Sequence, residues 1–393
     1  MTNRLQIDYE PARASILESV PTADIAVVGG GMLGLAHAWI LRRQGKRVVL
    51  FERHHRATGA SVRNFGMIWP IGQPAGAMHG MALRSRELWL EALQTARLHY
   101  RPTGSLHVAY RADEADVLRE FAEIGPSAGY PCQWLNAAET MNKSSAIVEA
   151  HLHGALWSDT ELTVDPREVS LNFTDYLREI GVACRYGSAV RKIQLPLVET
   201  ASERWEVDAA VVCSGDDFET LYPEVFAQSG LTRCKLQMMR TAPQPGEWQL
   251  GPALAAGLTL RFYKAFSICS TLSLLKARIA AEKPEYERWA IHVLASQTAD
   301  GAITLGDSHE YGLEPSVFDR SEIDDLILRE ARTFLKLPRW QIAERWHGVY
   351  CLHPERPFFE AEPAPGVRIL TAPGGSGMTL SFGLAERTAG LLG

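Results

Sequence analysis

Apolar runs and one stretch of helical periodicity open the chain. An apolar run at Asp24–Val28 precedes a glycine-rich turn, helical periodicity covers Leu33–Gln44, and a second apolar run follows at Arg47–Phe51. A strand, a helix and a second strand within about 30 residues match the size of a βαβ unit. The pattern therefore predicts a mononucleotide-binding half-fold at this point.

The pattern then changes from helical and buried-strand segments to alternating ones and back. Val207–Cys213 is a continuous apolar run after an acidic start, which is typical of a buried parallel strand. From Lys235 to Ser273 the pattern alternates, which predicts strands such as Thr259–Tyr263 and Ser267–Thr271. The other expected elements are helices from Met78 to Arg97, from Asp165 to Ile180 and at Leu274–Trp289, Ser321–Leu335 and Ser381–Leu392, and strands at Val182–Tyr186 and Val190–Leu195.

These elements predict an α/β fold of two parts. A discontinuous, Rossmann-type dinucleotide-binding domain is expected from the parallel-strand signals, with an inserted α+β substrate domain built on an antiparallel sheet. The expected ranges are an N-terminal extension at 1–23, the dinucleotide-binding domain at 24–80, 150–232 and 340–393, and the substrate domain at 81–149 and 233–339.

Composition and charge narrow the class of protein. A net charge of −6 argues against a nucleic-acid binder, which usually presents a basic face. Six cysteines without a C-x-x-C pair are typical of free thiols in a reducing compartment. Charged residues interrupt the first 23 positions, and no apolar run reaches 18 residues, so we expect no signal peptide and no membrane span. A cytoplasmic protein is therefore expected.

Gly29, Gly31 and Gly34 form a G-x-G-x-x-G motif between the first predicted strand and helix. The first glycine allows a tight turn, the second lets a pyrophosphate approach the backbone, and the third lets helix and strand pack closely. Glu52 follows the second strand, where a carboxylate accepts hydrogen bonds from ribose hydroxyls and repels a 2′-phosphate. The motif does not by itself distinguish NAD from FAD.

Three later segments favour FAD, because an extended FAD needs contacts from distant parts of the chain. They are Thr58–Ile68, the segment Ala210–Gly215, in which a strand ends in a small-residue turn, and the glycine-rich loop Pro373–Thr379. The last loop can present backbone N–H groups to the flavin ring.

With these segments the chain resembles the D-amino acid oxidase-like family of FAD-dependent oxidoreductases, which includes glycine and sarcosine oxidases. The resemblance runs from about Asp24 over nearly the whole chain. It implies one non-covalently bound FAD. The expected cofactor contacts are Gly29, Gly31, Met32, Leu33, Gly34, Glu52, Arg53, Ser61, Arg63, Asn64, Phe65, Gly66, Met67, Val190, Ser214, Gly215, Gly374, Gly375, Ser376, Gly377, Met378 and Thr379.

The chain departs from the family at one functional position. Amino-acid oxidases of the family usually carry Trp-x-Gly-x-Arg, whose arginine binds the substrate carboxylate through two hydrogen bonds. Here the segment is Trp346-His347-Gly348-Val349-Tyr350, so Tyr350 stands where the arginine is expected. An ordinary α-amino acid therefore loses its main anchor.

Local strings resemble a narrower subgroup associated with phosphonate catabolism, which implies oxidation of a small aminophosphonate. The strings are Arg63–Gln73, Leu260–Tyr263 and Gly306–Gly312. Arg261 and Tyr263 lie two apart on a predicted strand, so their side chains are expected to share a face and bind the anion. Tyr350 and His347 complete the predicted substrate site, whereas an Arg261 exposed on the strand is an equally ordinary interpretation.

Gly306-Asp307-Ser308-His309 mimics a motif of flavin hydroxylases, but the glycine-rich loop at 374–379 already fills that motif's place. We therefore interpret Asp307–Tyr311 as a turn after a strand, and His309 as a structural residue or one that supports the pocket from behind, in preference to a base. None of the 12 histidines has a metal-binding spacing, and no metal is expected.

The expected activity is oxidative deamination of 2-aminoethylphosphonate, or an N-methyl or hydroxy derivative, to an aldehyde with ammonia or methylamine. O2 is the expected electron acceptor, with release of H2O2. The alternatives are a glycine-, sarcosine- or D-amino acid-type oxidase or dehydrogenase with a rewired carboxylate site, a flavin monooxygenase, and a flavin-binding protein without catalysis.

Overall fold

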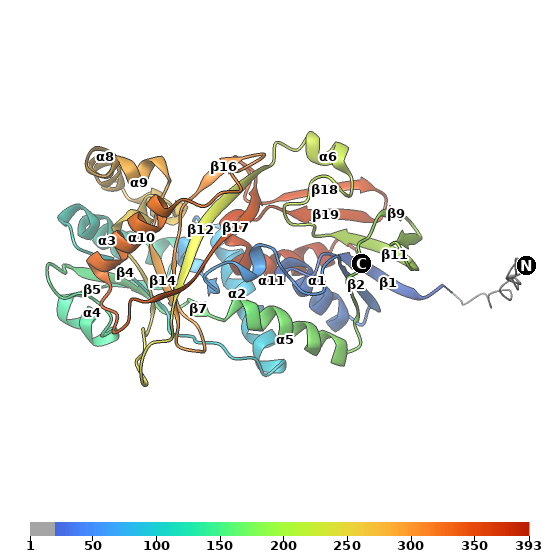
Figure 1. Ribbon diagram of the computed structural model, residues 1–393, viewed down its shortest axis with the longest axis horizontal. Helices are drawn as coiled ribbons and strands as arrows, with labels where there is room; N and C mark the ends of the chain where they lie inside the picture. Colours follow the sequence, from blue (N-terminus) through green and yellow to red (C-terminus); the bar gives the residue numbers. More distant parts are fainter. Residues whose placement is uncertain (1–19, 393) are drawn as a thin grey trace, which may run out of the picture.

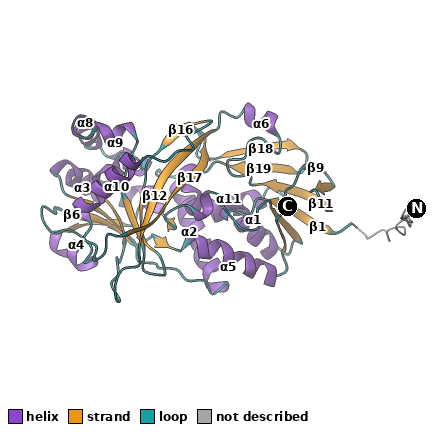
Figure 2. Ribbon diagram, viewed as in Figure 1, coloured by secondary structure: helices purple, strands orange, loops and turns teal. Residues whose placement is uncertain are grey.

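A computed structural model describes residues 20–392 of the protein, so most of the predicted N-terminal extension lies outside the described residues. Two large sheets lie one after the other along the longest axis of the molecule, with helices packed against both (Figures 1 and 2). The α/β fold class expected from the sequence is confirmed.

The first sheet is parallel at its centre. Its strand order is β18-β19-β11-β1-β2-β8, in which β18 alone runs antiparallel to its neighbour and β9 and β10 add an antiparallel extension to β11. The strands are β1 (Thr22–Val28), β2 (Val48–Glu52), β8 (Ala183–Tyr186), β9 (Lys192–Gln194), β10 (Leu197–Glu199), β11 (Arg204–Val212), β18 (Phe359–Ala364) and β19 (Val367–Thr371). The strands come from distant parts of the chain and bring those parts to one sheet edge.

Four helices share an aromatic core. They are α1 (Met32–Arg43), α2 (Ala77–Thr95), α5 (Pro166–Glu179) and α11 (Gly377–Ala389). Phe382 of α11 is fully buried, and its ring centroid lies 5.4 Å from that of Trp39, 4.7 Å from Trp89 and 5.9 Å from Phe173. One phenyl ring therefore joins all four helices.

The second sheet is mostly antiparallel. Its order is β16-β12-β15-β14-β13-β4-β6-β5, with β17 paired to β12 and only β13 and β4 parallel. The strands are β4 (Ser105–Ala109), β5 (Cys132–Asn136), β6 (Gly154–Ser158), β12 (Thr232–Thr241), β13 (Ala253–Ala255), β14 (Leu294–Gln297), β15 (Ile303–Gly306), β16 (Glu310–Gly312) and β17 (Ile342–Leu352).

The remaining elements cover or connect the sheets. Near the second sheet in Figure 1 lie α3 (Ala112–Ile124), α4 (Ala137–Lys143), α8 (Leu272–Glu282), α9 (Pro284–Arg288) and α10 (Ser321–Phe334). Shorter elements are β3 (Met67–Ile68), which pairs with β7 (Leu162–Thr163), and the helices α6 (Pro223–Ala227) and α7 (Gly257–Leu260).

The strands predicted at Thr259–Tyr263 and Ser267–Thr271 are wrong. The first segment forms α7 and its end, and a 3₁₀ helix covers Lys264–Ile268. Backbone hydrogen bonds here join residues three apart, for example from Phe262 N to Thr259 O at 3.0 Å. In so short an apolar segment, a strand and a helical turn bury similar positions. The spacing of apolar residues therefore does not distinguish the two structures.

Two helix boundaries also differ from the expectation. The helix predicted at Leu274–Trp289 is divided into α8 and α9 at Pro284, whose ring cannot continue a helix but suits its first turn. The last helix begins at Gly377 rather than Ser381.

The predicted domain ranges stay a prediction. Two strands from ranges assigned to the dinucleotide-binding domain, β6 and β17, lie in the second sheet. Within residues 20–392, no helix combines the length and apolar character that a membrane crossing requires.

Phe382→Ala should lower the free energy of unfolding by about 3–5 kcal/mol, because it leaves a cavity between four helices. Phe318→Ala is the matched control, since Phe318 is 77% exposed and should cost little. Urea unfolding followed by tryptophan fluorescence measures both; equal effects in the two variants would contradict the assigned role of Phe382.

Candidate functional site

A glycine turn joins the end of β1 to the start of α1 and sits against the end of β11. Gly29 has φ +113°, and a Cβ there would lie 2.2 Å from the carbonyl oxygen of Cys213. A Cβ on Gly34 would lie 1.8 Å from the oxygen of Gly29. Only glycine fits either position, and the turn leaves the N-terminus of α1 open to an anion.

A side chain from the loop after β2 accepts a hydrogen bond from the first residue of α1. The Oγ of Ser61 accepts a hydrogen bond from Met32 N at 2.9 Å, and a Cβ on Gly31 would lie 2.9 Å from the same Oγ. The next N–H groups of the helix have no partner within the helix, as at any helix start, and Met32 and Leu33 line the cavity. This arrangement suits a diphosphate.

Glu52 is fixed at the end of β2. Its Oε2 accepts from Gly30 N at 2.8 Å and its Oε1 from His54 N at 2.9 Å. A carboxylate held by two backbone donors keeps lone pairs free for sugar hydroxyls. The structure thus brings the predicted anion site and the predicted ribose site side by side.

One cavity of about 960 Å³ runs from this turn to the second sheet. Most of the predicted cofactor residues line it, namely Gly29, Gly31, Met32, Leu33, Glu52, Arg53, Ser61, Arg63, Asn64, Phe65, Val190, Ser214, Gly215, Gly374, Gly375, Ser376, Gly377 and Met378. Segments more than 300 residues apart in the sequence therefore meet on one surface.

Four predicted contacts do not line the cavity, and each has a packing role instead. Gly34 is the close-packing glycine described above. A Cβ on Gly66 would lie 2.0 Å from Val164 O, and Met67 belongs to β3. The Oγ1 of Thr379 accepts a hydrogen bond from Trp69 N at 2.8 Å.

These residues fit FAD. The glycine turn and α1 suit its diphosphate, Glu52 suits its ribose, and Gly374–Met378 at the start of α11 line the cavity toward the second sheet. Cys351 lies on the same wall, where its thiol donates to Gly215 O at 3.0 Å and burial raises its pKa to about 11. Non-covalent attachment of the FAD stays a prediction.

The second-sheet end of the cavity is rich in tyrosine. Tyr263 and Tyr350 line it, together with Tyr311, and Tyr350 lies on β17 opposite Cys234 of β12. Burial raises the pKa of all three phenols, that of Tyr311 to about 12. They therefore stay neutral and can donate hydrogen bonds to a substrate.

Arg261 and His347 do not line this cavity. Arg261 caps α7, where its guanidinium forms an ion pair with Glu287 and donates to Ile291 O at 2.6 Å. The strand predicted to place Arg261 beside Tyr263 is a helical turn instead. His347 Nδ1 lies 2.9 Å from Asp319 Oδ1 near the surface, on the other face of β17 from Tyr350.

Sequence reasoning assigned no place in the substrate site to three buried residues on the cavity wall. His292, Asp307 and His309 all line the cavity, and their nitrogen and oxygen atoms lie within 4.8 Å of one another. Two of them belong to Gly306–His309, which resembles a flavin-hydroxylase motif. No motif in the sequence includes His292. Lys264 also lines the cavity, is exposed, and has no ion-pair partner among residues 20–392.

Comparison with known proteins gives a family match over most of the chain. The family described as DAO, FAD dependent oxidoreductase, matches residues 24–391. The chain is 25% identical over 205 residues to the glycine oxidase of Geobacillus kaustophilus, and this alignment covers 49% of this chain and 54% of that protein. It is 27% identical over 195 residues to the mitochondrial L-2-hydroxyglutarate dehydrogenase of Homo sapiens, covering 47% and 40%. The aligned parts thus span about half, or less, of these curated relatives.

A solved structure is similar over nearly the whole chain. The crystal structure of the Geobacillus kaustophilus glycine oxidase matches with a TM-score of 0.73 and 18% identity, covering 95% of this chain and 94% of that one. At this identity the likeness establishes the fold.

Glu52→Ala should weaken FAD binding about 10- to 100-fold, because it removes a charged acceptor for sugar hydroxyls and frees two loop N–H groups. Glu179→Ala, at an exposed position on α5, is the matched control. The ratio of flavin to protein absorbance after dialysis measures retention; full retention by Glu52→Ala would contradict the ribose site.

Proposed function

The chain belongs to the family of FAD dependent oxidoreductases, and on this basis we propose that it oxidises a small amine at the carbon bearing the nitrogen. The observation that carries the proposal is the cavity, which joins the dinucleotide-binding sheet edge to a pocket lined by tyrosines and by buried histidines. Bound FAD supplies the two-electron acceptor, and the protein supplies position and electrostatics.

The side chains of the pocket bind and orient the substrate. Tyr263 and Tyr350 are neutral donors, and the Tyr263 ring packs closely on the backbone, since a Cβ on Gly72 would lie only 2.6 Å from it. Two phenol donors in one pocket restrict the orientation of a small molecule bound there. Orientation of this kind contributes several kcal/mol to catalysis.

The finer proposal is an aminophosphonate substrate, 2-aminoethylphosphonate or an N-methyl or hydroxy derivative. Tyr350 occupies the position of the family's carboxylate-binding arginine, so a carboxylate lacks its usual partner. Lys264 and Arg63 line the cavity and have no carboxylate partner among residues 20–392. Two separate cations suit a tetrahedral, multiply charged phosphonate. The products are an aldehyde and ammonia or methylamine, with O2 reduced to H2O2.

The second candidate is a glycine-, sarcosine- or D-amino acid-type oxidase or dehydrogenase. The similarity to a glycine oxidase favours it. In that case Lys264 or Arg63 would replace the missing arginine as the carboxylate partner.

An anaerobic substrate screen separates these candidates. The holoenzyme is mixed with 2-aminoethylphosphonate, its N-methyl derivative, sarcosine, glycine and D-alanine, and loss of flavin absorbance is followed. Fastest bleaching by an aminophosphonate is the expected result. Fastest bleaching by an amino acid would replace the finer proposal by the second candidate, and no bleaching by any amine would contradict amine oxidation.

Lys264→Ala should raise KM for 2-aminoethylphosphonate about 3- to 10-fold with little change in kcat, because an exposed cation contributes modest binding energy. Lys276→Ala on α8 is the control, since that side chain is also exposed and lies outside the cavity lining. Steady-state peroxide release measures both; identical KM values would remove Lys264 from the anion site.

A further inference from the structure

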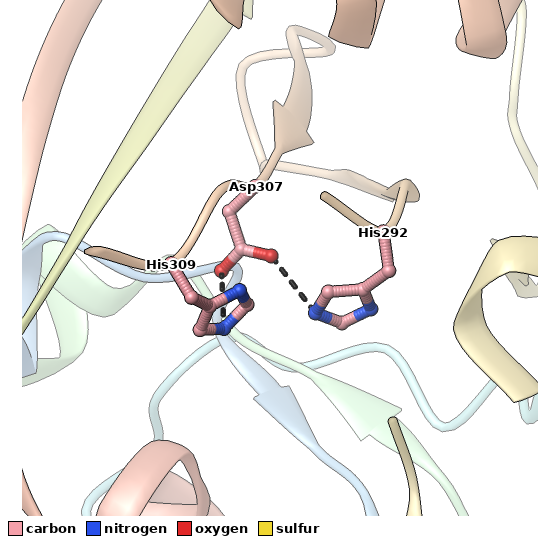
Figure 3. A group of neighbouring side chains, drawn as sticks. All are labelled: His292, Asp307 and His309. Carbon is pink, nitrogen blue, oxygen red and sulfur yellow. Dashed lines mark ion pairs between the residues drawn. The ribbon is translucent and has the colours of Figure 1, made fainter. Parts of the chain in front are cut away.

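A buried group of three side chains forms part of the cavity wall near the tyrosines. His292 and Asp307 are 4% and 5% exposed, and the His309 side chain is 8% exposed. Asp307 and His309 follow β15, whereas His292 precedes β14. The Asp307 carboxylate lies between the two imidazole rings, with one oxygen toward each (Figure 3).

A backbone contact fixes the tautomer of His309. Its Nδ1 lies 2.9 Å from the carbonyl oxygen of Ala290, which can only accept a hydrogen bond. The proton of a neutral ring therefore sits on Nδ1, and Nε2 carries a lone pair. That Nε2 faces Asp307 Oδ2 at 4.0 Å.

Two acceptors thus face each other across a gap that is too wide for a direct hydrogen bond. No hydrogen bond from residues 20–392 reaches Asp307 Oδ2 or His309 Nε2, although both residues line the cavity. Two hydrogen bonds of about 2.9 Å from one tetrahedral nitrogen reach acceptors roughly 4–5 Å apart. The gap therefore fits a nitrogen that carries at least two N–H groups.

We propose that Asp307 and His309 bind the amino nitrogen of the substrate and that His309 Nε2 accepts its proton. This inference rests on the proposed amine oxidation and adds to it the residues that recognise and deprotonate the amine. It also revises the interpretation of His309 as a structural or supporting residue.

The surroundings of the pair hold it in position. Two backbone hydrogen bonds join His292 and Asp307, from His292 N to Asp307 O at 3.1 Å and from Asp307 N to His292 O at 2.8 Å. His292 Nε2 lies 2.9 Å from Asp307 Oδ1, but the alignment falls short of a hydrogen bond and leaves Oδ1 free to accept one. The Phe262 ring stacks on His292 at 4.4 Å and on His309 at 5.2 Å between centroids. An aromatic wall beside a carboxylate suits an organic cation.

The proton transfer balances within the site. An N–H bond of the substrate ammonium breaks, a new N–H bond forms at His309 Nε2, and the electron pair stays on the substrate nitrogen. The positive charge moves to the imidazole, beside the carboxylate of Asp307. The neutral amine is the form whose lone pair assists loss of a hydride from the adjacent carbon.

The surroundings of His309 favour an imidazole that is unprotonated at neutral pH and can therefore accept a proton. Burial lowers the pKa of His309, with His292 and Arg261 acting in the same direction and Asp307 and the Ala290 carbonyl opposing them. The phenol of Tyr311 stacks on the ring and stays neutral. A lowered pKa favours the unprotonated ring before substrate binds.

The spacing favours an ammonium group over a metal ion. A first-row ion bonded at about 2.1 Å holds neighbouring ligand atoms roughly 3–3.5 Å apart. Here the separations on the two sides of the carboxylate are 2.9 Å and 4.0 Å. His292, Asp307 and His309 therefore do not surround one point at equal ligand distances.

The first test is anaerobic rapid mixing of FAD-loaded His309→Gln and Asp307→Asn with the panel amine that reduces the wild-type flavin fastest. Near neutral pH each variant should reduce flavin about 100-fold more slowly. His153→Gln, an exposed histidine outside the cavity lining, is the matched control. Flavin content and thermal midpoint confirm folding; unchanged rate constants in folded variants would overturn the inference.

The pH dependence separates a base from a merely structural residue. The wild-type rate constant should stay level from neutral pH toward the pKa of the substrate amine, because the enzyme deprotonates the bound ammonium. In His309→Gln only amine that is already neutral reacts, so the rate constant should rise about tenfold per pH unit. A variant that is slow but has the wild-type profile would contradict proton transfer to His309.

A third measurement does not depend on turnover. Ammonium chloride should perturb the visible flavin spectrum of the wild-type holoenzyme, and tetramethylammonium chloride, which has no N–H group, should not. Asp307→Asn should lose the response, and an equal response to both salts would overturn the inference. Stoichiometric zinc or iron that disappears in Asp307→Asn would also overturn it, in favour of a metal site. Failure of every amine to reduce flavin would contradict the proposed function, while the ammonium titration still decides this one.

Discussion

The close approach of three strand ends at one sheet edge is the constraint on which the rest of the structure depends. Gly29 N donates to Phe51 O at 2.8 Å and Cys213 N donates to Val28 O at 2.7 Å, which ties β1, β2 and β11 together where they end. With so little space between them, the turn must be glycine. Because parallel strands present their carboxyl ends together, the loops that follow each strand are gathered on one side, and the cavity forms between them.

Local signals made the dinucleotide-binding part predictable from sequence. The glycine spacing, the apolar runs on either side and the acid at Glu52 lie within one βαβ unit, so neighbours in the sequence are neighbours in space. Glycine-rich segments far along the chain were also recognisable, because turns that approach a ligand closely need that residue. Gly66 and Thr379 show the limit: both belong to predicted cofactor segments, but they contact neighbouring backbone instead of lining the cavity.

The substrate end was less predictable for physical reasons. Arg261 and Tyr263 lie in a short apolar segment that has no unambiguous period, and the fold resolved it as a helical turn, which sent the arginine toward Glu287. His292 reaches the site only because β14 and β15 pair, a contact made by the sheet and not by the sequence around it. Burial then decides the chemistry, since it keeps the phenols neutral and leaves polar atoms with few partners.

Helix α11 belongs both to the cofactor wall and to the core. Its first residues line the cavity, and one turn later Phe382 packs among three other helices. An occupied cofactor site and a formed helical core therefore reinforce each other through one element. By mass action, a ligand that binds only the folded chain adds to its stability in proportion to the logarithm of the ligand concentration. The concentration of flavin around the protein is thus coupled to the fraction of the chain that is folded.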